Sequence, residues 1–362
     1  MSRQQGASPR TPIGRVVAVG LALAAVVSII VLAFAWPAVT SDPHDLPIGI
    51  TGPDQAVAAA EAVVDEAQPG AIAFTALDDR AAAVEAIESR EVYGAIVLGE
   101  QPEVLTSSAA SLVVHQLLTG VAAQLEAGVN AQAAAAAAAA GAPAAPPHIA
   151  VEVTDVVPLA DTDPRGQALT AAMFPLVLGG MVGGIAISFA IIGAMRRVGA
   201  VVVYSVVGGL ALAGVLGPWL GALPGDYWTN AGVIALALSA IAAPITGFVA
   251  LIGRAGIAVG AITMMLVANP ISAAAFPREF LPGGWGAIGQ WFPPGAASTL
   301  LRDVNYFPQA DALFPWLVLA VWTAAGILLS GVGHFRTAGG AEPDAVAAHE
   351  DDPEPELAAA RA

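Results

Sequence analysis

The chain of 362 residues is 57% hydrophobic and only 12% charged, and it contains neither cysteine nor lysine. Because an average soluble protein carries about 25% charged residues, this composition indicates a membrane protein. The lack of cysteine excludes disulfides, thiolate nucleophiles and cysteine-ligated zinc.

The net charge of −16 is unevenly distributed. Residues 37–167 hold 18 acidic residues against three arginines, and residues 337–362 hold seven against one. The rest of the chain, which contains every apolar run, has a net charge of +5. Because acidic surfaces repel a polyphosphate backbone, we expect no nucleic acid partner.

Six uncharged apolar runs are each long enough to cross the hydrocarbon core of a bilayer, which takes about 20 residues. They are Val16–Ala35, Ala168–Met195, Val198–Leu223, Ala231–Gly253, Ala255–Phe276 and Ala312–Gly333. Runs that are apolar on every face offer no polar surface to water. Buried core helices of a soluble protein are the alternative, but a soluble domain of this size rarely needs six of them.

The first 15 residues form a short N-terminal segment, followed by a first span at 16–36. Three arginines and a small-residue stretch, Ala33 to Ala35, also fit a signal peptide. The apolar core is longer than the usual 7–15 residues of such a peptide, which favours an uncleaved anchor. Both alternatives export the segment that follows.

Residues 37–167 predict an α/β domain. Stretches bounded by turn residues predict five strands, at 45–52, 70–79, 91–100, 103–108 and 148–160. Helices are predicted at 54–68, 78–91 and 109–140, with Asp54 and Asp78 at the first two N-termini. This alternation is typical of βαβ units around a small sheet. The alanine tract of the third helix favours a helical stalk, with a flexible linker as the alternative.

Arginine positions predict how the chain is oriented. Arg3, Arg10 and Arg15 precede the first span, Arg196 and Arg197 follow the second, Arg254 follows the fourth, and Arg336 follows the sixth. Because positive residues tend to stay in the cytoplasm, both termini are expected there and residues 37–167 and 277–311 outside. Arg278 and Arg302 lie in the second outer segment against this rule. We therefore expect a multi-pass cell-membrane protein with a five-helix domain at 168–335 and an acidic, unstructured cytoplasmic tail at 336–362.

Glycines within the spans predict close helix packing. Gly179 and Gly183, Gly180 and Gly184, and Gly256 and Gly260 each have the GxxxG spacing that lets helix backbones approach. The same spacing is also a weak indication of dimerisation. Prolines at 175, 218, 244 and 270 predict kinks in or near the spans.

The segment at 277–311 is rich in aromatic residues and is interrupted by prolines. Two short helical pieces are expected, "GWGAIGQW" and "GAASTLLRDVNYF". We expect a re-entrant loop in the outer leaflet, with a loop lying flat on the membrane as the alternative. Its candidate site residues are Trp285, Trp291, Phe292, Pro293, Pro294 and Arg302.

The sequence supports neither catalysis nor cofactor binding. The phosphate-binding loop, HExxH and GxSxG are all absent, and the five histidines are scattered. Ionisable residues are missing from the middle of every span, which counts against an ion-coupled carrier. We therefore predict that the chain is not an enzyme and binds no metal or cofactor.

The layout of one span, an outer domain, then five spans with a broken segment before the last resembles that of ABC-2-type permeases, especially the YhgE/Pip-like branch. Two stretches carry the resemblance: "ALDDRAAAVEAIESREVYGAIVLGE" with "LTSSAAS", and "FPREFLPGGWGAIGQWFPPGAASTLLRD". Together they frame most of residues 15–335.

The resemblance implies the membrane half of an exporter that pairs with a second permease chain, identical or different, and is driven by a separate cytoplasmic ATPase. Substrates of such exporters are often lipids, drugs or envelope polymers. Arg196, Arg197 and Arg254 would be the ATPase contacts, and topology anchoring is their alternative role. Here the turn between the second and third spans lacks the short helix with which family permeases touch their ATPase.

A second hypothesis is a non-transporting surface protein, similar to phage-infection proteins, whose acidic outer domain binds or organises a cell-envelope partner. A membrane-embedded enzyme is a distant third.

Overall fold

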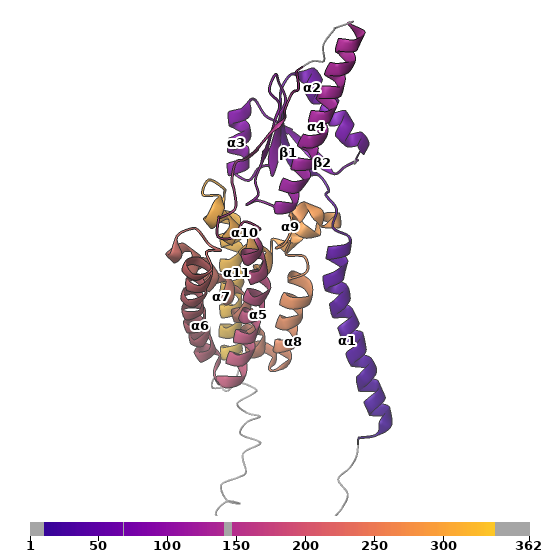
Figure 1. The fold of residues 1–362 in the computed structure, drawn as a ribbon. Coiled ribbons are helices and arrows are strands. Elements are labelled where there is room, and N and C mark those ends of the chain that lie inside the picture. The colour runs from indigo at the N-terminus through magenta and orange to yellow at the C-terminus, as the bar shows by residue number, and fades with distance from the viewer. Residues whose placement is uncertain (1–10, 68, 141–146, 337–362) are drawn as a thin grey trace, which may run out of the picture.

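The computed structural model describes residues 11–67, 69–140 and 147–336. These residues form a helical bundle with an α/β domain at one end (Figure 1). Most of the predicted break "GAPAAPP", the arginines at positions 3 and 10, and the acidic tail from residue 337 on lie outside the described residues.

The first helix, α1 (Ile13–Val39), leads from the far end of the bundle up to the α/β domain (Figure 1). It covers the predicted first span and extends it by three residues on each side. Its apolar side chains are mostly exposed.

All five predicted strands are confirmed, and they form one sheet in the order β2-β1-β3-β4-β5. Their bounds are β1 (Leu46–Thr51), β2 (Ile72–Ala76), β3 (Gly94–Val97), β4 (Glu103–Thr106) and β5 (Glu152–Asp155). Strand β1 pairs in parallel with β2 and β3, β3 pairs antiparallel with β4, and β4 pairs in parallel with β5. The parallel β1–β2 and β1–β3 pairs require crossover connections, as expected of βαβ units.

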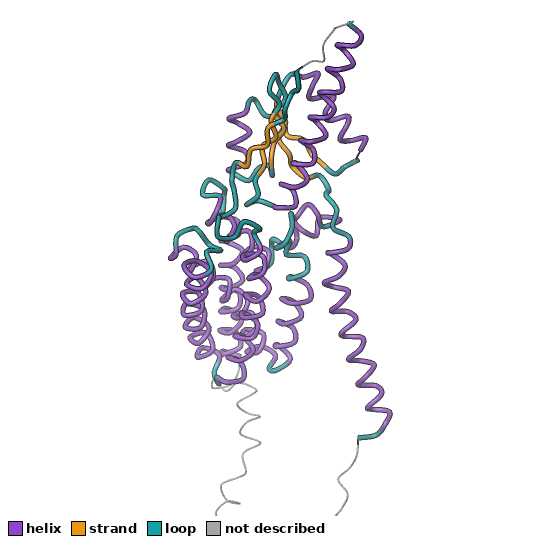
Figure 2. The backbone as a smooth tube through the Cα atoms, in the orientation of Figure 1, coloured by secondary structure: helices purple, strands orange, loops and turns teal. Residues whose placement is uncertain are grey.

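Helices cover both faces of this sheet (Figure 2). α2 (Asp54–Ala67) and α4 (Leu112–Ala139) pack on one face, where Leu118 belongs to the same buried cluster as the strand residues Ile48 and Ile50. α3 (Arg80–Glu88) packs on the other face. The predicted cap of this helix was one residue early, because Asp79 accepts the Ala82 N–H at 2.8 Å.

The bundle contains five helical elements, with α7 at its centre. They are α5 (Gln167–Ala190), α6 (Ala194–Gly214) with its π-helical continuation η1 (Val215–Trp219), α7 (Tyr227–Ile252), α8 (Ala255–Ala261) with the π-helical η2 (Ile262–Ala268), and α11 (Leu313–Arg336). α7 contacts α5, α6, α8 and α11, and most of its residues are buried.

The turn between α5 and α6 lies earlier than predicted. α5 ends at Ala190, and the turn is made at Gly193, whose φ of 102° suits only glycine. Arg196 and Arg197 therefore lie in the first turn of α6 and not in the loop between the spans.

Six helices of the described residues are long and apolar enough to cross a membrane, which matches the predicted number. Their membership differs from the prediction. The alanine-rich α4 qualifies by length and composition, although it packs on the sheet. The predicted fifth span, Ala255–Phe276, is helical only over Ala255–Ala268, because the chain turns at Asn269 and Pro270.

The aromatic segment forms short helices at the end of the bundle next to the α/β domain (Figure 1). They are the 3-10 turns η3 (Arg278–Phe280) and η4 (Pro282–Gly284), then α9 (Trp285–Gly289) and α10 (Pro293–Tyr306). The two expected helical pieces are confirmed. Pro293 and Pro294 lie inside the first turn of α10, where a missing N–H costs nothing.

Candidate functional site: a polar cavity between the α/β domain and the bundle

Glycines allow the broken segment to fold tightly on itself. A Cβ atom built on Gly289 would lie 1.8 Å from the Ile271 carbonyl oxygen, and one on Gly286 would lie 2.0 Å from that of Arg278. A Cβ atom built on Gly295, in α10, would lie 2.3 Å from the Gly289 carbonyl oxygen. Any larger residue at these positions would push the segment apart, so the glycines fix the position of α10.

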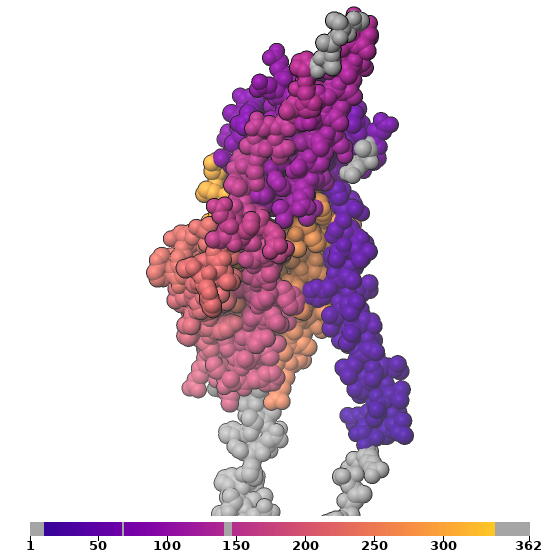
Figure 3. Space-filling model, viewed as in Figure 1, coloured from indigo at the N-terminus to yellow at the C-terminus, as the bar shows by residue number. Residues whose placement is uncertain are grey.

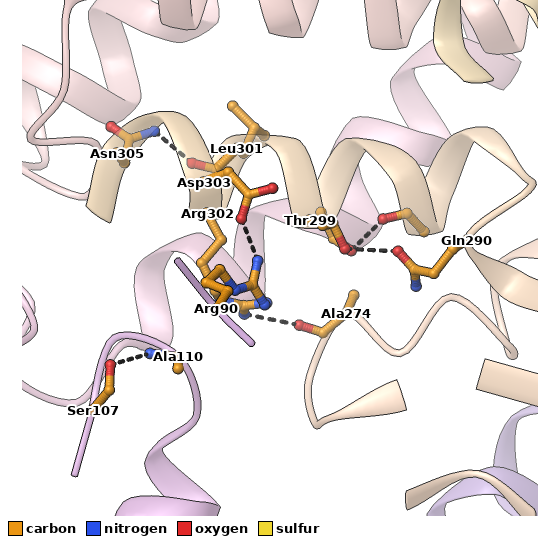
Figure 4. Close-up of polar contacts among 12 residues, drawn as sticks. Arg90, Ser107, Ala110, Ala274, Gln290, Thr299, Leu301, Arg302, Asp303 and Asn305 are labelled. Atoms are coloured by element: carbon orange, nitrogen blue, oxygen red, sulfur yellow. Dashed lines mark hydrogen bonds and ion pairs between the residues drawn. The ribbon is translucent and has the colours of Figure 1, made fainter. Parts of the chain in front are cut away.

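Side-chain hydrogen bonds hold α9 and α10 to the turn that precedes them. The buried Gln290 donates to the Ser272 carbonyl oxygen at 3.1 Å. It also accepts from the Thr299 hydroxyl at 2.7 Å (Figure 4). α10 also packs against α7 and α11, and more than half of its residues are buried. This segment is therefore a packed part of the bundle and not a loose loop.

The α/β domain is joined to this segment by charged and polar contacts. Arg90 forms an ion pair with Asp303 of α10, and the Tyr93 hydroxyl donates to the Glu279 carboxylate at 2.9 Å. The Phe307 ring, 1% exposed, packs between the two parts against Ala109 and lies 5.3 Å from the Arg90 guanidinium.

Arg90 occupies a backbone conformation that normally favours glycine. Its φ is 63°, at the carboxyl end of α3, where the Glu91 N–H bonds back to the Ala86 carbonyl oxygen. An arginine there costs conformational energy that a glycine would avoid. The side chain uses this position to reach α10 across the domain boundary.

Between the two parts lies a cavity of about 640 Å³. Its walls come from the segment after α3, the start of α4, the start of α5, the turn before η3, and α10. Arg302 of α10 lines it. Among the described residues, the one hydrogen-bond acceptor within reach of its guanidinium is the Ala274 carbonyl oxygen, at 3.4 Å (Figure 4).

Burial shifts the ionisation of the groups around this cavity. Desolvation, and next the neighbouring Arg90 guanidinium, lower the pKa of Arg302 to about 10. Desolvation raises the pKa of Asp303, against the opposing effect of Arg90. Desolvation also raises the pKa of the Tyr93 hydroxyl, with the Glu279 carboxylate as the second cause. Arg302 still remains protonated near neutral pH.

The candidate ATPase contacts lie at the opposite end of the bundle. Arg196, in the first turn of α6, and Arg254, between α7 and α8, are exposed at the end of the bundle remote from the α/β domain. Arg197 is 2% exposed and donates to the carbonyl oxygens of Ile191 and Ser188 at 2.7 and 3.2 Å. Arg197 therefore satisfies carbonyl groups at the carboxyl end of α5 and is not exposed on the surface of this chain.

The six glycines singled out in the sequence lie mostly at close contacts within the chain. Cβ atoms built on Gly180, Gly183 and Gly260 would lie 2.8 Å or less from side chains of neighbouring helices. A Cβ atom built on Gly184 would lie 3.1 Å from the Ala242 backbone, and one built on Gly256 would collide with the backbone of Phe248. Gly179 is looser, and its carbonyl oxygen accepts from the Tyr204 hydroxyl at 2.7 Å. The spacing reflects packing within one chain and gives no support to the dimer.

The aromatic residues of the segment divide into two groups. Trp285 and Trp291 are exposed, and the Trp291 ring meets Phe314 edge-on at 4.9 Å. Phe292 is partly buried against Trp322, and both prolines are buried. Only Arg302, of the candidate residues in this segment, lines the cavity.

Sequence reasoning missed Arg90, Tyr93, Glu279 and Asp303. One signal for two of them was present, because only four acidic residues lie outside the α/β segment and the tail. They are Asp226, Glu279, Asp303 and Asp311. The partners Arg90 and Tyr93 could not be assigned without the tertiary structure.

Among the described residues, no three histidine or acidic side chains are grouped so that they could hold a metal ion. Comparison of the chain with protein-family models, with curated proteins and with solved structures found no match. Function therefore has to be argued from the geometry.

Proposed function

We propose that the chain is a membrane-spanning permease subunit of an ABC-2-type exporter, which moves a lipophilic or cell-envelope substrate and is driven by a separate ATPase. The α/β domain lies outside the cell in this proposal, and both termini lie in the cytoplasm. A second permease chain, identical or different, completes the exporter.

The observation that carries this proposal is the cavity at the α/β end of the bundle. It is walled by the broken segment on one side and by the α/β domain on the other. A pocket of this size, lined by a mixture of charged, polar and apolar side chains, can hold a small molecule. Its position at the outer end of an apolar bundle suits release of a substrate from the membrane.

The sequence itself also supports an external source of energy. The printed sequence contains no phosphate-binding loop, and in this proposal another chain supplies ATP hydrolysis by that route. The exposed Arg196 and Arg254 lie at the end of the bundle that would face a cytoplasmic ATPase.

Orientation can be tested with cysteine labelling, because the chain has no native cysteine. A single cysteine at the exposed Glu100 should react with a membrane-impermeant maleimide on intact cells. A cysteine at the exposed Ala255 should react only after the cells are opened. The reverse pattern would place the α/β domain in the cytoplasm and remove the basis of the proposal.

Coupling is tested by purifying the chain with the phosphate-loop ATPases encoded beside it. A stable complex with stimulated ATP hydrolysis is expected, and the double change Arg196→Glu with Arg254→Glu should weaken it. Arg336→Glu, at the end of α11, is the matched control. Failure of every candidate ATPase to bind or to be stimulated would contradict the transport proposal.

One observation favours the second candidate, a surface protein that binds an envelope partner. Only the first half of α4 packs on the sheet, through Val114, Leu118 and Ala122. The alanine-rich second half projects beyond the domain (Figure 1). If this candidate is right, deleting residues 131–140 should abolish binding of the envelope partner. If the permease proposal is right instead, the same deletion should leave transport intact.

A further inference from the structure

Two guanidinium groups lie near one carboxylate at the wall of the cavity. Asp303 pairs with Arg90, and Arg302 lies beside them on the same helix as Asp303 (Figure 4). The Arg90 and Arg302 guanidinium groups are close enough to repel each other. The three side chains together carry one excess positive charge in a largely desolvated place, which is costly unless an anion compensates it.

Three of the other four carboxylates around the cavity accept hydrogen bonds from groups other than Arg302. Glu279 accepts hydrogen bonds from Arg278 at 2.8 Å and from the Tyr93 hydroxyl. Asp163 accepts the backbone N–H groups at the start of α5, and Asp311 accepts the Leu313 N–H at 2.9 Å. Glu91 also lines the cavity and is exposed. Among the described residues, the Arg302 guanidinium forms no direct ion pair, although the lining of the whole cavity includes five carboxylates and four arginines.

We propose that this cavity binds a phosphate group, with Arg302 and Arg90 as its ligands. Two guanidinium groups from different elements meet here, one from the end of α3 and one from α10. The oxygens of a phosphate point in several directions and accept from two guanidinium groups at once, whereas a carboxylate offers two oxygens in one plane. This binding does not depend on the transport proposal; it would name the substrate as a phosphate-bearing amphiphile if transport is confirmed.

The remaining walls accommodate more than an inorganic ion. The cavity of about 640 Å³ is much larger than one phosphate and is also lined by Leu159, Leu169 and Phe276. Apolar area of this kind suits the glycerol or upper chain region of a phospholipid. Free phosphate and a lipid phosphate share the chemistry that Arg302 recognises, and the experiment separates them.

Binding is measured by isothermal titration on the purified full chain in dodecyl maltoside micelles. The probes are inorganic phosphate, dioleoyl phosphatidic acid, and dioleoylglycerol as the phosphate-free lipid. Binding of phosphatidic acid without free phosphate identifies a lipid site, and binding of free phosphate alone identifies a small-anion site; both support the proposal. No binding of either phosphate probe, or equal binding of dioleoylglycerol, overturns it.

Substitutions then locate the binding. Arg302→Gln should weaken phosphate binding roughly tenfold or more, as expected for the loss of a charged hydrogen-bond donor. Arg336→Gln, an exposed arginine at the far end of α11, should leave the affinity unchanged. Unchanged affinity in Arg302→Gln overturns the assignment to this cavity.

Asp303→Asn should change the phosphate affinity in the opposite direction to Arg302→Gln. A purely structural role of Asp303 would not raise that affinity. It removes the carboxylate that competes for both guanidinium groups, so the affinity for phosphate should rise several-fold. A folded Asp303→Asn chain with equal or weaker affinity would overturn the proposal, even if Arg302→Gln fails to fold. ATPase coupling is not involved in either measurement, so the two proposals can fail separately.

Discussion

Helices α1 and α7 can both cross a membrane, yet they are packed in opposite ways. α1 is the more apolar of the two, and none of its most apolar stretch is buried, whereas most of that of α7 is. The space-filling view shows the lower half of α1 standing apart from the bundle (Figure 3). Hydropathy therefore identifies a helix that belongs in lipid, but it does not tell whether protein surrounds that helix.

Small residues make the difference between the two helices. α7 meets α11 where Ala243, Gly247 and Ala250 oppose Gly326 and Gly333, and the backbones come close enough that a built Cβ would collide. The glycines of α1, at positions 14 and 20, have no heavy atom within 4 Å of such a Cβ. Close backbone approach, which strengthens packing between apolar helices, is thus confined to the bundle.

The largest effect is expected from Gly326→Leu. A Cβ at this position would lie 2.3 Å from the Ala243 carbonyl carbon of α7, so the two helices must separate. Overpacking of this kind should lower the free energy of unfolding by about 3 kcal/mol or prevent folding. The measurement is thermal unfolding in detergent, followed by size-exclusion chromatography after heating.

Gly20→Leu in α1 is the matched control and should leave the unfolding temperature almost unchanged. If both substitutions destabilise the chain equally, α1 is packed against protein in the folded molecule, and the contrast between the two helices is wrong.

Much of this fold follows from the sequence. Turn residues and periodicity located all five strands, and unbroken apolar runs located α1, α5, α6, α7 and α11. The predicted helix bounds were wrong where individual turn residues, and not the apolar composition, determine where a helix begins or ends. Gly193 set the turn before Arg196, and Asn269 with Pro270 ended the fifth helix early.

The cavity could not be predicted, because its charged groups come from segments far apart in the chain. Arg90 and Asp303 are separated by 213 residues, and no local spacing relates them. The sequence marked Arg302 as a candidate residue of the predicted re-entrant loop and as an arginine on the wrong side of a topology rule, but not as part of a cavity. A positive residue in a predicted outer segment was, in retrospect, the available signal for a site.

Arg197→Gln tests the carboxyl end of α5, which lies against α7. The guanidinium donates to two carbonyl oxygens of the preceding helix, and a shorter amide cannot reach both. Leaving buried carbonyl groups unsatisfied should cost about 2 kcal/mol. The neighbouring Arg196→Gln is exposed and should cost almost nothing in the same unfolding measurement. Equal losses would mean that both arginines act through charge alone.

Asn305→Ala tests how the start of α7 is held to α10. Asn305 exchanges two side-chain hydrogen bonds with Asn230, at 3.0 and 2.7 Å, and accepts the Gly225 N–H at 2.8 Å. Its loss should lower the free energy of unfolding by about 1.5 kcal/mol, because Asn230 is 2% exposed and would be left without these bonds.

The double change Asn230→Ala with Asn305→Ala checks that the two amides act together. It should cost clearly less than the sum of the single changes, since each single change already breaks the shared bonds. Additive losses would show that the two side chains stabilise α7 independently.

The smallest effect is expected where α1 does meet the bundle. The ring of Phe34 lies edge-on to that of Phe174 in α5, with the ring centroids 6.2 Å apart. Phe34→Leu keeps the apolar character and loses the ring contact, so the free energy of unfolding should fall by only about 0.5 kcal/mol. Phe189→Leu, on the exposed surface of α5, is the control and should change nothing measurable. A loss above about 2 kcal/mol for Phe34→Leu would exceed what one aromatic pair supplies. It would show that α1 owes its position to protein contacts, as α7 does, and not mainly to lipid.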